Sequence, residues 1–178
     1  MFGNKETGNL TFYYDSDKLF NDVSLMSAYM TKNLANDGGS LMDEFNISDD
    51  EKDIYKVCVR QTLPNIYETM MKITSGITNA FEDEVTVAAK ENAGLKREQG
   101  VYIEFNMQDN DAYNENVLSL VDATLLNCLK HGILAEFYSI CFHDGLYKMA
   151  KDKFTVSLFQ LKHRLFQLKK KSVSSQLS

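Results

Sequence analysis

The sequence predicts a mainly α-helical fold: a small bundle of four to five helices with a β-hairpin and with extended N- and C-terminal arms. One proline and nine glycines in 178 residues leave room for long uninterrupted helices. Apolar residues recur at helical spacing in several long stretches, whereas residues 101–107 alternate as a β-strand does. Hydrophobic content of 44% and charged content of 25% are typical of a soluble globular protein.

The chain begins with a predicted extended arm and a helix, which together make up residues 1–45. In the arm, residues 10–14 are expected to form a short strand or to dock on a neighbouring molecule. Asp15 or Ser16 then caps the helix, which ends at about Asn36 because an Asp-Gly-Gly-Ser sequence follows. Its apolar face is expected to contain Leu19, Phe20, Val23, Met26, Met30 and Leu34.

A second helix begins at a capping box, in which Ser48 and Glu51 are spaced to bond to each other's backbone amides. Pro64 lacks an amide hydrogen and clashes with the preceding turn, so we expect it to end or kink this helix near Thr62. The helix then resumes to about Ala80. Its buried side chains are expected to be Ile54, Val57, Cys58, Ile66, Tyr67, Met70, Ile73 and Ile77.

The middle of the chain allows two structures. Residues 85–87 and 101–107 alternate as strands and predict a hairpin near 84–107, with a long mobile loop over the polar residues 90–100. A helix over residues 84–98 is the alternative.

The third long helix, residues 114–141, is apolar around much of its circumference and is therefore expected to be the central core helix. A His-Asp-Gly turn separates it from a last helix over residues 146–171, which completes a domain of residues 46–171. The inner side of this helix is expected to carry Met149, Phe154, Leu158, Leu161, Leu165 and Leu168. Residues 172–178 have too little apolar content to order and predict a disordered tail.

Charge is divided unevenly along the chain. From Gly145 onward there are eight Lys and Arg residues and one Asp, a net charge of +7, whereas residues 1–144 carry −13. An acidic body with one basic end can attract copies of itself or a partner head to tail. The charge distribution therefore indicates assembly rather than catalysis.

The sequence contains none of the motifs that mark common enzyme or metal sites, such as a glycine-rich phosphate loop, His-Glu-x-x-His, Cys-x-x-Cys or Gly-x-Ser-x-Gly. Cys128 and His131, on one predicted helix, come nearest to a pair of metal ligands. No catalytic residue, cofactor or metal site is therefore predicted. The three cysteines, Cys58, Cys128 and Cys141, are expected to be buried free thiols in a reducing cytoplasm.

Two groups of charged residues are candidates for function. Asp122 and Glu136 lie on the apolar third helix, where each is either a buried acid with a raised pKa or part of a solvent-facing stripe. A basic cluster near the C-terminus complements the helix dipole, contacts an acidic protein surface, or contacts nucleic-acid phosphates. Its members are Lys162, Arg164, Lys169, Lys170 and Lys171.

The order of elements over residues 50–171 is distinctive. A helix with an internal Leu-Pro-Asn-Ile-Tyr step at 63–67 is followed by the strand at 101–107 and by a long helix that contains Leu-Ala-Glu-Phe-Tyr at 134–138. A Lys/Arg-rich helix closes the chain. This arrangement resembles the head-tail connector (neck adaptor) proteins of tailed bacteriophages, especially those of gut Bacteroidales phages.

The resemblance implies a structural virion protein of the neck, made in the host cytoplasm, with no enzyme activity. Such proteins form a homo-oligomeric, commonly dodecameric, ring under the portal protein and dock the next neck or tail protein. The ring extends the channel for genomic DNA, which passes without sequence-specific binding. By this analogy the basic cluster contacts the portal, and the N-terminal arm and the 90–100 loop touch neighbouring subunits or the tail side.

Other classes of function stay open beside this one. One is a cytoplasmic helical adaptor or regulatory protein that binds a single protein partner. Another is a nucleic-acid-binding protein that uses the basic C-terminal helix, although the net charge of −6 disfavours it. Association with a membrane is not expected, because no run of about eighteen consecutive apolar residues is present.

Overall fold

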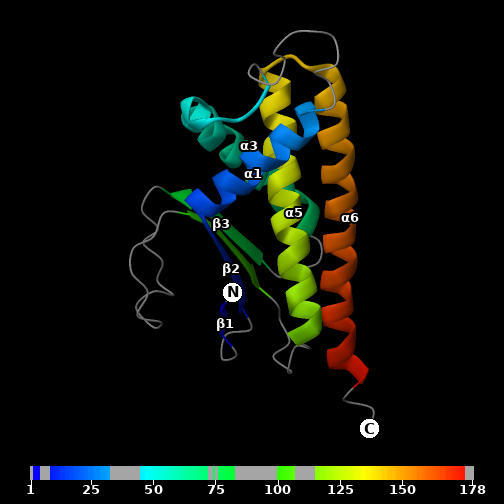
Figure 1. Cartoon of the computed structure of the whole chain (residues 1–178). Coiled ribbons are helices and arrows are strands. Elements are labelled where there is room, and N and C mark those ends of the chain that lie inside the picture. Colours follow the sequence, from blue (N-terminus) through cyan, green and yellow to red (C-terminus); the bar gives the residue numbers. More distant parts are fainter. Residues whose placement is uncertain are drawn as a thin grey trace.

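The computed structural model describes residues 2–4, 9–32, 45–71, 74, 76–82, 100–106 and 115–174. Within these ranges it contains four α-helices and one four-stranded antiparallel sheet, so the prediction of a mainly α fold with a small helical bundle and a hairpin is confirmed (Figure 1). In chain order the elements are β1 (Phe2–Asn4), β2 (Asn9–Asp15), α1 (Ser16–Lys32), the short 3-10 helix η2 (Asp49–Glu51), α3 (Lys52–Met70), β3 (Gly76–Glu82), β4 (Gly100–Asn106), α5 (Glu115–Ile140) and α6 (Asp144–Ser174).

The sheet has the strand order β1-β2-β4-β3, which places β4 between a strand from the N-terminus and its own hairpin partner. Strand β2 pairs with β4 along its whole length, and β3 pairs with β4 from the other side. One face of the sheet is buried, because Val101, Ile103 and Phe105 alternate inward on β4 as the period of two requires. The rings of Phe12 on β2 and Phe105 on β4 pack edge to face, with their centroids 5.7 Å apart.

The helices form a layer beside the sheet, with α5 at its centre (Figure 1). Helices α5 and α6 form an antiparallel hairpin, and α3 and α1 also pack on α5. One continuous core contains residues from α1, α3, α5, α6 and the sheet. Leu10 and Phe12 of the N-terminal strand belong to that core, so the predicted extended segment pairs within the fold.

Gly132 lies where α3 and α6 both approach α5. A Cβ atom at this position would overlap the methyl group of Thr62 and lie 3.0 Å from the ring of Phe154. The Thr62 side chain cannot easily move away, because it is buried and its hydroxyl donates to the carbonyl of Cys58 at 2.8 Å. Glycine is therefore required here for close packing of three helices.

We expect Gly132→Ala to destabilise the protein by about 1 kcal/mol, since the cost of overpacking exceeds the gain in helix propensity. Urea unfolding followed by circular dichroism measures this change. Asn127→Ala, at an exposed position of the same helix, is the control and should leave stability within about 0.5 kcal/mol of the wild type. A stabilised Gly132→Ala variant would contradict the close approach.

The prediction for the second helix is correct at its start and wrong at its end. The Ser48–Glu51 capping box forms, and the Glu51 carboxylate accepts from the Ser48 amide at 2.8 Å. The helix α3 runs through Pro64, which is exposed, without ending there. It stops at Met70, and residues 76–82, expected to be partly helical, form β3 instead.

The buried face of α3 also differs from the prediction. Ile54 and Val57, expected inside, are exposed, whereas Cys58, Ile66 and Met70 are buried as expected. The inward face is shifted by about one residue because it follows the contacts with α5 and β3 rather than the apolar pattern alone. Its members are Tyr55, Cys58, Val59, Thr62, Leu63, Ile66 and Met70.

The hairpin forms, but its first strand precedes the predicted position. Strand β3 pairs with β4 in antiparallel register, from Gly76 opposite Asn106 to Glu82 opposite Gly100. Residues 85–87, the expected first strand, lie outside the described residues, as do the predicted loop and the alternative helix over 84–98.

The remaining helices follow the predictions closely. Asp15 caps α1 by accepting from the Lys18 amide at 2.9 Å, α1 is described to Lys32, and α5 is the central core helix. Met149, expected on the inner side of α6, is exposed. The helix continues to Ser174, so the first three residues of the predicted disordered tail are helical, and residues 175–178 lie outside the described part of the chain.

One stretch of α5, Val117–Ile140, is long and apolar enough to cross a membrane by length and mean hydropathy. The core helix of a globular fold passes the same test, and this helix packs between α3 and α6. The length and composition of α5 therefore carry no conclusion about a membrane.

Candidate partner-binding surfaces

The basic cluster divides into residues of different environment. Arg164 is tied to the neighbouring helix, because its guanidinium donates to the Leu120 carbonyl at 2.6 Å and to the Thr124 hydroxyl. Lys162 is half-buried on the same helix. Lys169, Lys170 and Lys171 continue α6, but their side chains lie outside the described ones. The structure thus gives Arg164 a packing role between α5 and α6.

The acidic candidates Asp122 and Glu136 are both half-buried. Tyr14 of β2 donates to the Asp122 carboxylate at 2.8 Å and also approaches its carbonyl oxygen at 3.2 Å. Burial, followed by the charge of Asp122, raises the pKa of Tyr14 above its ordinary value, so the phenol stays a donor. Asp122 therefore joins the N-terminal strand to the central helix, a role that the sequence pattern did not indicate.

The cysteines are free, as predicted; Cys58 and Cys128 are buried as expected, whereas Cys141 is only partly buried. Burial and the nearby Glu136 carboxylate raise the pKa of Cys58 to about 12, and burial alone raises that of Cys128 to about 12. Thiols with such pKa values are poor nucleophiles at neutral pH. Among the described residues, no three His, Cys, Asp or Glu side chains gather as a metal site would require.

Two helices carry large apolar side chains that face away from the body. On α6, Val156, Phe159 and Phe166 share one face and are all exposed; we call this the α6 strip. On α1, Leu25 and Tyr29 lie one turn apart and form the α1 strip. Phe159 is 72% exposed and Tyr29 is 76% exposed, so most of each side chain is accessible to a partner.

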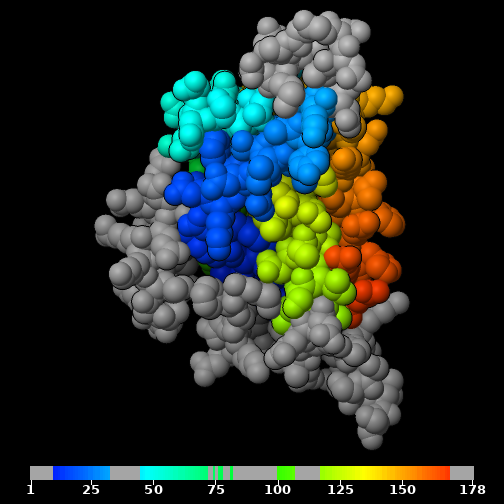
Figure 2. All heavy atoms as spheres, in the orientation of Figure 1, coloured from blue at the N-terminus to red at the C-terminus, as the bar shows by residue number. Residues whose placement is uncertain are grey.

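The two strips lie on separate parts of the surface. In Figure 2 the atoms of α5 (yellow-green) lie between the first part of α1 (blue) and the lower part of α6 (orange to red), while the end of α1 (light blue) borders α6. The α6 strip lies on a helix with a net positive charge, whereas the acidic residues belong mainly to the rest of the chain.

The turn between α5 and α6, residues 141–143, presents one further aromatic side chain. Phe142 is 92% exposed and has a φ of 54°, in the left-handed region. Its amide donates to the Ser139 carbonyl at 3.3 Å, and the His143 amide donates to the Tyr138 carbonyl at 3.1 Å. These two bonds define a Schellman motif, which favours glycine at the position that Phe142 holds.

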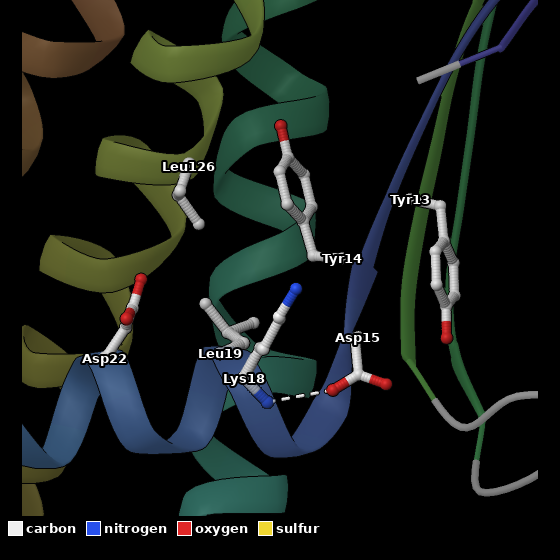
Figure 3. A pocket seen from close by; sticks show the side chains of 7 residues that line it. All are labelled: Tyr13, Tyr14, Asp15, Lys18, Leu19, Asp22 and Leu126. Atoms are coloured by element: carbon white, nitrogen blue, oxygen red, sulfur yellow. Dashed lines mark hydrogen bonds between the residues drawn. The ribbon is translucent and has the colours of Figure 1, made fainter.

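A hollow of about 780 Å³ opens between β2, α1 and α5. Figure 3 shows Lys18 and Asp22 reaching from α1 into this hollow, with Tyr14 and Leu126 on its walls. Tyr13 points to the other side of β2, and Asp15 bonds to the first turn of α1. The hollow therefore combines apolar walls with one cationic side chain and with carboxylates. Its lining consists of Tyr13, Tyr14, Asp15, Lys18, Leu19, Asp22 and Leu126.

Replacing a tyrosine by phenylalanine should affect stability differently at Tyr138 and at Tyr14. The Tyr138 hydroxyl is fully buried and has no hydrogen-bond partner among the described residues, whereas the Tyr14 hydroxyl is bonded to Asp122. We expect Tyr138→Phe to leave stability unchanged or to raise it by about 1 kcal/mol, and Tyr14→Phe to lower it by about 1 to 2 kcal/mol. Chemical denaturation of the two variants side by side measures the difference; a loss in Tyr138→Phe equal to that in Tyr14→Phe would show that Tyr138 has a partner.

Comparison with known proteins finds no family model, no curated protein and no solved structure that matches this chain.

Proposed function

We propose that this protein is a structural component of a bacteriophage neck: a head-tail connector that assembles as a ring, docks on the portal protein, and receives the next neck or tail protein. The proposal joins the resemblance in element order to one structural observation. Large apolar side chains lie exposed on two unlike surfaces, the α1 strip and the α6 strip. Exposed apolar groups of this size are typical of surfaces that become covered on assembly.

Two unlike surfaces on one chain favour heterologous contacts, which close into a ring when the rotation between neighbours permits. The uneven charge supports the same geometry, since the basic C-terminal helix of one subunit is attracted to the acidic body of another. In the proposed virion, genomic DNA passes through the ring without sequence-specific binding. The proposed portal contacts are Lys162, Lys169, Lys170 and Lys171. Arg164 instead holds α6 against α5.

Native mass spectrometry with negative-stain imaging over a concentration series tests the proposal. We expect a closed ring, as heterologous contacts allow, and the resemblance to connector proteins implies about twelve subunits. Phe159→Ser, in the α6 strip, should weaken the ring, whereas Gln160→Ser, at the next exposed position of the same helix, should not. A truncation after Gly145 would not test the role of α6 in the ring. It would remove buried core residues such as Phe154 and Leu161 and so disturb the fold itself.

A monomer at every concentration that binds one protein partner in a one-to-one complex would contradict the ring. That outcome would favour the cytoplasmic adaptor, for which the same strips would be the docking surface. Tight, salt-dependent binding of plain duplex DNA would favour the nucleic-acid-binding alternative.

A further inference from the structure

Phe142 has a backbone conformation that its side chain makes unfavourable. A Cβ atom in the left-handed region approaches the following carbonyl, which is why glycine is the usual residue at this position of a Schellman motif. Strain of this kind is normally offset by packing, but Phe142 is 92% exposed and gains almost no contact within the chain. A strained residue that contributes nothing to the core indicates a function outside it.

The turn around Phe142 is fixed on both sides. The two Schellman bonds hold it to the end of α5. On the other side, the His143 ring packs edge to face on Phe45 at 4.7 Å, and its Nδ1 accepts from the Leu146 amide at 3.1 Å, which caps α6. The aromatic ring is therefore presented from a rigid support, and rigidity lowers the entropic cost of binding.

The hollow between β2, α1 and α5 offers a matching receptor. Leu126 and the ring of Tyr14, both partly exposed, supply apolar walls, Leu19 lies buried beneath them, and Tyr14 is itself held by its bond to Asp122. Lys18 extends into the same space, where an ammonium group can lie over an aromatic face (Figure 3). An aromatic side chain placed here would make dispersion contacts with Tyr14 and Leu126 and could lie against the ammonium group of Lys18, beside the carboxylate of Asp22.

Phe142 cannot occupy the hollow of its own chain. Leu126 lies fourteen residues before the end of α5, which corresponds to about 21 Å along the helix. Figure 1 likewise shows the α5–α6 turn at one end of the helical layer, while β2 and the start of α1 meet near its middle. An occupant that is an aromatic side chain must therefore come from another molecule.

We propose that Phe142 of one copy inserts into the hollow of a second copy and forms the central contact of a head-to-tail interface. The two surfaces are unlike and lie apart on each subunit, so each copy can donate its Phe142 to one neighbour and accept that of another. The inference rests on the self-assembly in the proposed function and adds one specific contact to those of the α1 strip and the α6 strip.

Phe142→Gly distinguishes a role in self-association from a role in folding, because it should weaken association and at the same time stabilise the fold. Glycine relieves the left-handed strain, so the midpoint of urea unfolding should rise. Self-association, measured by analytical ultracentrifugation of the full chain, should weaken at least about tenfold if Phe142 is an anchor of the interface. Phe142→Asn, which also tolerates this conformation, should behave in the same way.

Variants of the hollow provide the reciprocal test. Lys18→Glu places a carboxylate against the negative face of the ring and should also weaken association, whereas Lys32→Glu, exposed on the same helix outside the hollow, should not. A photoreactive benzoylphenylalanine at position 142 should crosslink between copies to peptides that contain Tyr14, Lys18 or Leu126.

The outcomes distinguish this inference from the proposed function. Rings that persist in Phe142→Gly, or crosslinks that map elsewhere, overturn the docking of Phe142 and leave a ring connector standing. A wild-type protein that stays monomeric at every concentration overturns both. Loss of association in Phe142→Gly and in Lys18→Glu, together with a raised unfolding midpoint in the former, supports the inference.

Discussion

Phe12→Ala is expected to lower the free energy of unfolding by about 3 to 5 kcal/mol, the largest effect among the changes considered. Phe12 is completely buried, packs edge to face on Phe105, and lies in the strand that pairs with β4. Its removal leaves a cavity between the sheet and the helices that β-sheet pairing prevents from closing. Urea unfolding of the purified variant measures the loss.

Tyr29→Ala is the matched control, because Tyr29 is a large aromatic side chain of the same N-terminal region but is exposed. Its effect on the unfolding of the monomer should stay within about 0.5 kcal/mol. A loss of less than about 1 kcal/mol in Phe12→Ala would mean that the N-terminal strand contributes little to the core.

Arg164→Ala is expected to cost about 2 to 3 kcal/mol, because both acceptors on α5 lose a charged donor. The Leu120 carbonyl and the Thr124 hydroxyl both accept from the same guanidinium nitrogen, Nη1 of Arg164. Arg164→Lys should recover only part of this stability, since the flexible lysine side chain lacks the rigid planar group that places Nη1 against both acceptors. Thermal and chemical unfolding of the two variants, with Lys162→Gln as the control, measure the effect.

The contrast between these variants also separates packing from partner contact. If Arg164 served only as a surface charge, Arg164→Lys would match the wild type in stability, and Arg164→Ala and Lys162→Gln would have similar small effects. That pattern would contradict the packing role.

The helical part of the fold was predictable because its signals are local. The apolar circumference of α5 identified the core helix, and the Ser48–Glu51 capping box marked the start of α3. The β3 strand was missed because Ile77 continues the helical spacing of α3, and only pairing with β4 decides its conformation. Ile54 and Val57 were placed inside for a related reason: an apolar pattern does not show which side of a helix has a neighbour.

The candidate surfaces were harder to predict from the sequence than the helices. Arg164 and Lys162 are both basic residues of one helix, and nothing in their spacing indicates that only the first has acceptors on α5. Phe142 in its sequence context reads as an ordinary apolar residue after a core helix. Its exposure and its φ of 54° result from the Schellman turn, which the sequence does not signal because the usual glycine is absent.

The sequence by itself determined the mainly helical class, the central position of α5, the free cysteines and the division of charge between the body and the last helix. These properties depend on composition and on spacing within a few turns. Only the tertiary structure decided that the N-terminal strand pairs with β4, that Tyr14 bonds to Asp122, and that the hollow and Phe142 lie apart. Contacts between residues distant in the chain require three-dimensional packing, because loop closure and burial, rather than local propensity, select them.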